Sequence, residues 1–173
     1  NGRLIEYTPS TGKSKVIMDG LVFANGVAVS HDQASVLVNE TGNYRVLRYW
    51  LGGPRSGQVD IVIDNLPGFP DNISAARNGG YYVGLASPRS SAVDKLADSP
   101  FLRKIVQRLP KLLRPQGQAY GHLIKISERG EIELSLQDPT GAFPFTTGAI
   151  ETDEELYISS LTATAVGVLG LKE

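Results

Sequence analysis

The sequence contains no cysteine, which excludes disulfide bonds and metal sites built on thiolates. It has only two histidines, His31 and His122, too few for a zinc site made mainly of imidazole ligands. No apolar run approaches the ~20 residues that a transmembrane helix needs. The net charge is only −1 at pH 7, and no aromatic residues alternate with a basic stripe. We therefore expect no nucleic-acid partner.

The common motifs of nucleophilic and phosphate chemistry are also missing. The sequence has neither the G-x-S-x-G of serine hydrolases nor the G-x-x-x-x-G-K of phosphate-binding loops. We expect no serine to pair with a histidine, so a Ser-His-Asp mechanism is not predicted. His31 falls in the turn "SHDQ", where we expect an exposed and inert side chain.

Short β-type runs dominate the 173 residues, of which 41% are hydrophobic. The runs are rich in Val, Ile, Leu and Tyr, and Gly, Pro, Asn and Asp separate them in turns such as "TPSTGK" and "LGGPRSG". This composition allows one domain with a substantial core. The pattern predicts an antiparallel all-β fold made of hairpins.

The runs recur in units of similar layout. One unit begins "FANGVAVSHD", a second "FPDNISAARN" and a third "FPFTTGAIET". Asn25 and Asn72 are about 47 residues apart, and Asn72 and Thr147 are separated by a longer stretch that includes an insert of roughly 26 residues. Without the insert the period is again about 49 residues, which is typical of the four-stranded blades of a β-propeller.

Counting strands divides the chain into parts of two, four, four and three. We expect the end of one blade at residues 1–20, a blade at 21–66, a blade with the insert at 67–140, and the last blade at 141–173. This is about the C-terminal three and a half blades of a larger ring. The sequence begins without methionine, and we expect the rest of the ring and any targeting region to precede it, so the localisation stays open.

The insert, at about residues 90–115, is the one segment with helical periodicity. Its apolar residues follow i, i+3, i+4 spacing, and Ser99 before Pro100 is a plausible helix start. Its polar face is basic, with Arg103, Lys104, Arg108, Lys111 and Arg114. The helix either packs on the ring with this face in solvent, covers the mouth of the tunnel, or contacts a membrane surface.

Polar residues occur at the same point of each unit, just before the strand expected to line the central channel. These residues are Asn25, Asp71 with Asn72, and Thr146 with Thr147. If they converge on the axis, their carboxylate and amide oxygens suit calcium. The alternative is that they only stabilise turns.

Two further residues are candidates for chemistry. Glu40 ends the second strand of its unit near Arg45, and it forms either a structural ion pair or part of a catalytic site. His122 opens a strand after the insert. If that strand enters from the tunnel side, His122 could carry a proton near neutral pH; otherwise it is a packing residue.

An ordered series of motifs runs along essentially the whole chain. It includes "FANGVAVS", "ETGNYRVLRYWLGGP", "DNLPGFPDNI", "YGHLIKI", "LQDPTG" and "ETDEELYISSL". The series resembles strictosidine-synthase-like proteins of the gluconolactonase- and paraoxonase-type propeller superfamily. The resemblance implies a six-bladed β-propeller, with a calcium ion on the axis in many members.

The resemblance also implies roles for particular residues. By motif match, the calcium-binding asparagine and the "DN" pair of paraoxonase-like proteins become Asn25, Asp71 and Asn72, and the other ligands lie in earlier blades. The catalytic glutamate of true strictosidine synthase falls at Thr147, which cannot act as an acid or base near neutral pH. The paraoxonase histidine falls at Ala86, so neither mechanism transfers residue by residue.

Together the residues and the resemblance predict a calcium-dependent hydrolase of lactones or other small-molecule esters. His122, Glu40 and Thr147 are the catalytic candidates, and Asn25, Asp71 and Asn72 are the metal ligands. The alternative is a non-enzymatic binding or scaffold module with structural calcium. A condensing synthase is the third possibility, and the threonine at the glutamate position argues against it.

Overall fold

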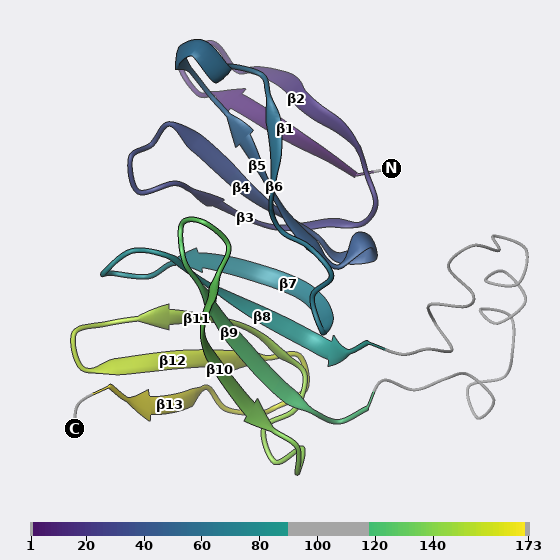
Figure 1. Ribbon diagram of the computed structural model, residues 1–173, viewed down its shortest axis with the longest axis vertical. Helices are drawn as coiled ribbons and strands as arrows, with labels where there is room; N and C mark the ends of the chain where they lie inside the picture. Colours follow the sequence, from purple (N-terminus) through teal and green to yellow (C-terminus); the bar gives the residue numbers. More distant parts are fainter. Residues whose placement is uncertain (1, 90–117, 172–173) are drawn as a thin grey trace, which may run out of the picture.

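The computed structural model describes residues 2–89 and 118–171 of the chain. They form four antiparallel sheets of two, four, four and three strands (Figure 1). The fold of the described residues is therefore all-β and propeller-like. The segment predicted to be helical, at about residues 90–115, lies outside the described residues.

The strands follow one another in chain order within each sheet. The first sheet pairs β1 (Gly2–Thr8) with β2 (Lys13–Leu21). The second contains β3 (Ala24–Val29), β4 (Ser35–Glu40), β5 (Arg45–Trp50) and β6 (Val59–Ile63). The third contains β7 (Gly68–Ala75), β8 (Tyr81–Pro88), β9 (Gly121–Ile126) and β10 (Ile132–Asp138). The fourth contains β11 (Thr146–Glu151), β12 (Glu155–Ser160) and β13 (Gly167–Gly170).

The sheets stack face to face, as Figure 1 shows. The first strands of the last three sheets lie side by side, with β7 between β3 and β11. Helical structure in residues 2–89 and 118–171 is limited to two short 3₁₀ turns, Thr41–Asn43 and Gly53–Arg55. None of the helices there is long and apolar enough to cross a membrane.

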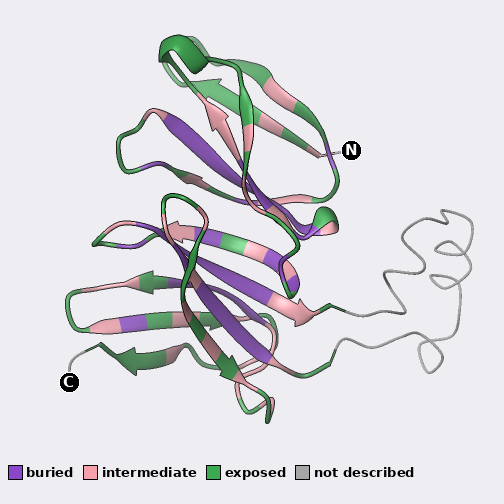
Figure 2. Ribbon diagram, in the orientation of Figure 1, coloured by how far each residue is buried: buried purple, intermediate pink, exposed green. Residues whose placement is uncertain are grey.

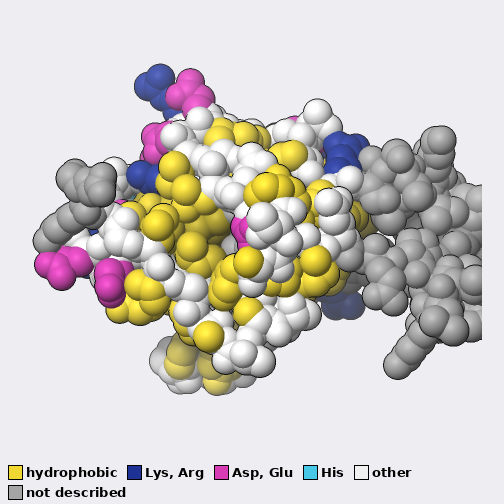
Figure 3. Space-filling model, turned by 90° about the horizontal axis from the view of Figure 1, so that it is seen from below, with side chains coloured by type: hydrophobic (Ala, Val, Ile, Leu, Met, Phe, Trp, Pro, Cys, Tyr) yellow, Lys and Arg dark blue, Asp and Glu magenta, His cyan; other side chains and the backbone are white. Residues whose placement is uncertain are grey.

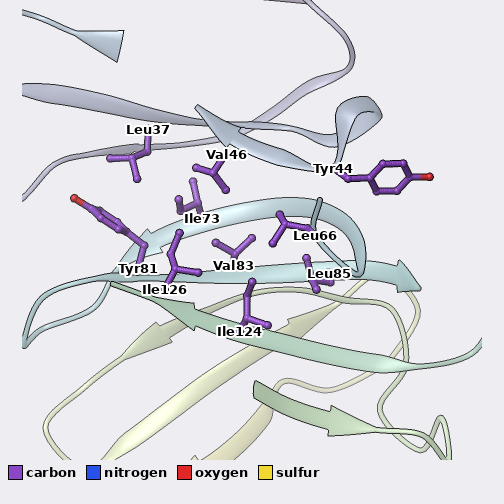
Figure 4. Packing of buried hydrophobic residues seen from close by; sticks show 10 residues of the cluster. All are labelled: Leu37, Tyr44, Val46, Leu66, Ile73, Tyr81, Val83, Leu85, Ile124 and Ile126. Carbon is purple, nitrogen blue, oxygen red and sulfur yellow. The ribbon is translucent and has the colours of Figure 1, made fainter. Parts of the chain in front are cut away.

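The strands in the middle of the stack bury both of their faces, because successive side chains point to opposite sides of a sheet. In β4, Leu37 packs toward the third sheet, whereas Val36 and Val38 pack toward the first. In β8, Val83 belongs to the same cluster as Leu37, and Tyr82 packs with the fourth sheet. Figure 4 shows the larger cluster between the second and third sheets. Burial of each such side chain contributes about 1.5–3 kcal/mol.

Burial falls off at both ends of the stack (Figure 2). In the first sheet, Ile5, Tyr7 and Val16 are exposed. The opposite end of the stack, which carries the fourth sheet, shows a gathering of hydrophobic side chains in Figure 3. The exposed apolar residues of this sheet and its connections include Ile150, Tyr157, Leu161, Val166, Val168 and Leu169. Two apolar surfaces therefore flank the well-packed centre.

His31 is exposed, as predicted, but its ring also joins the second and third sheets, which the sequence did not predict. Its Nδ1 lies 2.7 Å from a carboxylate oxygen of Glu128, and its Nε2 lies 2.7 Å from the carbonyl oxygen of Ala76. Arg48 and the hydroxyl of Tyr81 also donate to Glu128. Both partners of the ring are acceptors, so both ring nitrogens must carry a proton to satisfy them. The turn pattern could not reveal these contacts, because Glu128 lies far away in the sequence.

We expect this contact to make folding stability depend on pH. The hydrogen bond to Ala76 and the charge of Glu128 outweigh burial and raise the pKa of His31 above its ordinary value of 6.5. A raised histidine pKa stabilises the fold fully below the unfolded value, and this stabilisation is lost as pH rises through the folded value. Urea unfolding at about pH 6 and about pH 8.5 should show this loss in the parent and a smaller one in His31→Gln. Equal pH dependence in both proteins would contradict the prediction.

Candidate functional site

A β-bulge interrupts β3 and β7 at the same level of the stack. In β3, Asn25 and Gly26 face the single residue Asn39 across the ladder. In β7, Asp71 and Asn72 face the single residue between Leu85 and Val83. We had placed these residues in turns before the strands, which is wrong. The extra residue of a bulge is accommodated inside a strand, and it turns the side chain out of the regular pattern.

The third inner strand is irregular at the corresponding point. In β11 the register shifts between Thr146 and Gly148, so Thr147 has no directly paired residue. Both threonines are buried. The hydroxyl of Thr147 lies 2.6 Å from that of Ser159 on β12, and the hydroxyl of Thr146 accepts a hydrogen bond from the backbone of His122. The threonines are thus fixed by hydrogen bonds to neighbouring strands.

Two glycines, which have no side chain, allow the three irregular points to lie close together. A Cβ atom on Gly26 would lie 2.6 Å from the Cα of Asn72, so only glycine allows this approach. A Cβ atom on Gly148 would lie 3.1 Å from the Cβ of Asn72. Asn72 therefore lies between the glycine that follows Asn25 and the glycine that follows Thr147. Sequence positions in three different sheets meet here.

Asp71 is the carboxylate of this cluster, and it is only partly exposed. Burial raises the pKa of Asp71, and a hydrogen bond with the side chain of Asn25 works against that rise. A buried carboxylate with one amide partner is a costly arrangement unless further positive charge or hydrogen bonds compensate it. The structure thus brings Asn25, Asp71 and Asn72 together.

The donor types fit a hard cation. Residues 2–89 and 118–171 contain no group of three or more His, Cys, Asp or Glu side chains that could hold a metal ion. The cluster instead offers one carboxylate and two amide side chains, the oxygen donors that calcium accepts and zinc rarely uses. A third amide oxygen, Oδ1 of Asn39, is buried without a hydrogen-bond partner among the described residues, and the nitrogen of the same amide donates to the backbone of Asp71. Because calcium takes six to eight oxygen ligands, these residues would supply part of its shell.

Glu40 lies in the same sheet as Asn25, and its carboxylate is fully engaged. One oxygen accepts the backbone N–H of Val22 at 2.7 Å, and the other accepts Nε of Arg45 at 2.5 Å. Burial would raise the pKa of Glu40, but these hydrogen bonds outweigh it and hold the pKa below its ordinary value. The ion pair with Arg45, which we had considered as the alternative to catalysis, is present.

His122 does not join the oxygen cluster. It lies on β9, the third strand of its sheet, and not on the inner strand β7. Its Nε2 is 3.0 Å from the hydroxyl of Ser135 on β10, so the prediction that no serine pairs with a histidine is wrong. Gln137 donates to the same hydroxyl at 2.9 Å, and Tyr120 donates to Gln137. Burial lowers the pKa of His122, which favours a neutral ring.

Each of the missed contacts has its own cause. His122 and Ser135 meet diagonally across the β9–β10 ladder, whose register shifts between Ile132 and Leu134. No residue pattern marks such a shift in advance. Asn39 was overlooked because it falls inside an apolar run, "SVLVNE", which reads simply as a buried strand.

Comparison with known proteins gives consistent relatives. The family model described as Strictosidine synthase matches residues 1–54. The chain is 36% identical to the adipocyte plasma membrane-associated protein of Bos taurus, over 94% of the chain and 41% of that protein. It is 37% identical to Strictosidine synthase-like 10 of Arabidopsis thaliana, over 98% of the chain and 47% of that protein. The chain thus spans less than half the length of these curated relatives.

Solved structures with the same fold are more distant in sequence. A gluconolactonase of Xanthomonas campestris superposes with a TM-score of 0.64 at 15% identity, covering 99% of this chain and 52% of the enzyme. A luciferin-regenerating enzyme superposes with a TM-score of 0.58 at 21% identity, covering 87% of this chain and 41% of that one. At these identities the likeness establishes the fold.

Proposed function

Because the chain is related along nearly its whole length to strictosidine-synthase-like proteins, we propose that it forms part of a calcium-dependent hydrolase of lactones or other esters. The observation that carries the proposal is the meeting of Asn25, Asp71 and Asn72 at bulges of adjacent inner strands. Oxygen donors of this kind are expected where a calcium ion lies on the axis of a propeller.

In this proposal Asn25, Asp71 and Asn72 hold the ion. Bound calcium would polarise the ester carbonyl and stabilise the negative charge that develops on its oxygen. The bulges fix the ligand side chains before binding, so little conformational freedom is lost when the ion arrives. Thr147, paired with Ser159, offers neutral hydroxyl groups beside the cluster that can orient a substrate by hydrogen bonding.

Further support comes from the fold relatives and from the ends of the stack. One fold relative is named a gluconolactonase, which is the basis for proposing a lactone or related ester as the substrate. The exposed apolar faces of the first and fourth sheets would be covered by neighbouring sheets in a closed ring. We propose six blades for the full protein and an active site completed by residues beyond this chain.

A second function has one observation in its favour. Of the three catalytic candidates, Glu40 is held by Arg45 and His122 lies on a third strand, so neither points to a role beside the oxygen cluster. Thr147 is close to the cluster but cannot serve as a base. This arrangement equally supports a binding or scaffold module whose calcium is structural. The absence of an acid at Thr147 disfavours a condensing synthase.

Calcium titration of the full-length protein against lactones and aryl esters tests the proposal. We expect hydrolysis that rises with calcium, saturates, and disappears on chelation, because the ion supplies the charge that stabilises the transition state. The measurement is the initial rate for each ester at a series of free calcium concentrations. Calcium binding without turnover of any ester would favour the binding module, and no calcium binding would reject both functions.

A further inference from the structure

Asn39 occupies the point where the second and third sheets meet. It lies on β4, opposite the bulge formed by Asn25 and Gly26, and its side chain is completely buried. A buried amide is costly unless its hydrogen bonds are made. Valine or alanine would be the simpler choice in the middle of a hydrophobic strand, so the contacts of Asn39 need an explanation.

The amide group of Asn39 holds the backbone of the neighbouring bulge. Its Nδ2 donates to the carbonyl oxygen of Asp71 at 2.8 Å. Two residues further along the chain, in the 3₁₀ turn that follows β4, the hydroxyl of Thr41 donates to the carbonyl oxygen of Pro70 at 2.5 Å. A bulge removes carbonyl groups from the regular ladder, and these two donors capture consecutive carbonyls just before Asn72. The ligand-bearing segment of β7 is therefore fixed by β4 of another sheet.

The corresponding position of the third sheet is occupied by a glycine. Gly84 faces the bulge of Asp71 and Asn72, and there the backbone of Thr147 packs directly against the glycine, with no room for a side chain. Asn39 is the equivalent residue one sheet earlier, where a polar side chain fills the space and bonds to the neighbouring strand. The contrast indicates that Asn39 sets the position of β7 relative to β3.

The orientation of the Asn39 amide follows from its partner. A backbone carbonyl can only accept, so the nitrogen must face the carbonyl of Asp71 and the oxygen is the free end of the amide. That oxygen is buried and has no hydrogen-bond partner among the described residues. Buried acceptors are nearly always satisfied in folded proteins, and the hydrated shell of a cation beside Asp71 would supply the missing donor.

We propose that Asn39 is a positioning residue for the calcium ligands, fixing Asp71 and Asn72 through its nitrogen and accepting from the hydrated ion through its oxygen. This inference rests on the proposed calcium site. Residues that orient metal ligands typically change affinity ten- to a hundredfold when they are replaced. Thr41 shares the positioning role, but its hydroxyl already has a partner whereas Oδ1 of Asn39 has none among the described residues, so replacement of Thr41 should have the smaller effect.

The test measures calcium affinity of the full-length protein by competition with terbium luminescence. Asn39→Leu should weaken calcium binding about ten- to a hundredfold, and Thr41→Val should weaken it by less. Thr41→Ser keeps the hydroxyl and should restore the parent affinity. Val38→Ala is the matched control, since it leaves a cavity on the same strand but faces the first sheet. We expect it to lower the melting temperature and leave calcium affinity within about twofold.

A second measurement separates the positioning role of Asn39 from the proposed calcium-dependent function. Hydrogen–deuterium exchange of the metal-free proteins should be faster in β7 for Asn39→Leu than for Val38→Ala, because only the first loses the bond to Asp71. Parent-like calcium affinity in Asn39→Leu, or an equal loss in Val38→Ala, would overturn the inference. If the parent protein binds no calcium, the proposed function fails, and unchanged exchange in β7 would reject the role of Asn39 as well.

Discussion

Asp71→Asn is expected to weaken calcium binding by at least about a hundredfold and to abolish any calcium-dependent ester hydrolysis. Asp71 is the carboxylate of a cluster whose other proposed ligands are the neutral amides of Asn25 and Asn72. Charge count is a principal determinant of calcium affinity in oxygen-ligand sites. The asparagine keeps the shape of the side chain and a carbonyl oxygen, so the loss would come from the charge and not from a collapsed site.

Without calcium, Asp71→Asn should be at least as stable as the parent protein. Burial disfavours the ionised form of Asp71, as its raised pKa indicates, and a neutral amide removes that cost. The metal-free melting temperature of Asp71→Asn should therefore equal or exceed that of the parent, while the increase produced by calcium should vanish. Asp19→Asn is the charge-matched control, since Asp19 is exposed on β2. A lower metal-free stability together with normal calcium binding would show that Asp71 is a structural residue.

The meeting of Asn25 with Asp71 and Asn72 could be foreseen because repeated units place equivalent residues at equivalent points around an axis. The alternation of apolar residues and the period of the units were enough to predict the strands. The bulges could not be foreseen, since one additional residue in a strand leaves no mark in an apolar pattern. The residues predicted to lie in turns are therefore at bulges within β3 and β7, where Asn25 still meets Asp71 and Asn72.

Contacts between distant segments account for most of what the sequence did not reveal. His31 and Glu128 meet because the turn of one sheet lies against the β9–β10 turn of the next. The pair of His122 with Ser135 depends on a register shift that moves one strand relative to the other. The first contact follows from how the sheets stack and the second from the register within one sheet, and local residue patterns carry information on neither.

Among the glycines beside the site, a Cβ atom would come closest to a neighbouring sheet at Gly84, so this glycine should tolerate a side chain least. A Cβ atom at this position would overlap the backbone carbonyl of Thr147, which no change of rotamer can relieve. Gly84→Ala should therefore lower the free energy of unfolding by about 3 kcal/mol, and for a domain of this size the melting temperature by roughly 6–12 °C.

We expect the same substitution to affect the proposed calcium site through β11. If the alanine on β8 pushes β11 away from the third sheet, Gly148 moves away from Asn72 and this proposed ligand loses its support. Gly52→Ala provides the control, because a Cβ atom on Gly52 meets nothing within 4 Å. Thermal unfolding of both variants with and without calcium distinguishes the possibilities. If Gly84→Ala loses stability but calcium still raises its melting temperature as in the parent, β11 contributes to the core but not to the site. If the calcium-induced rise is lost as well, the spacing of the inner strands determines metal binding.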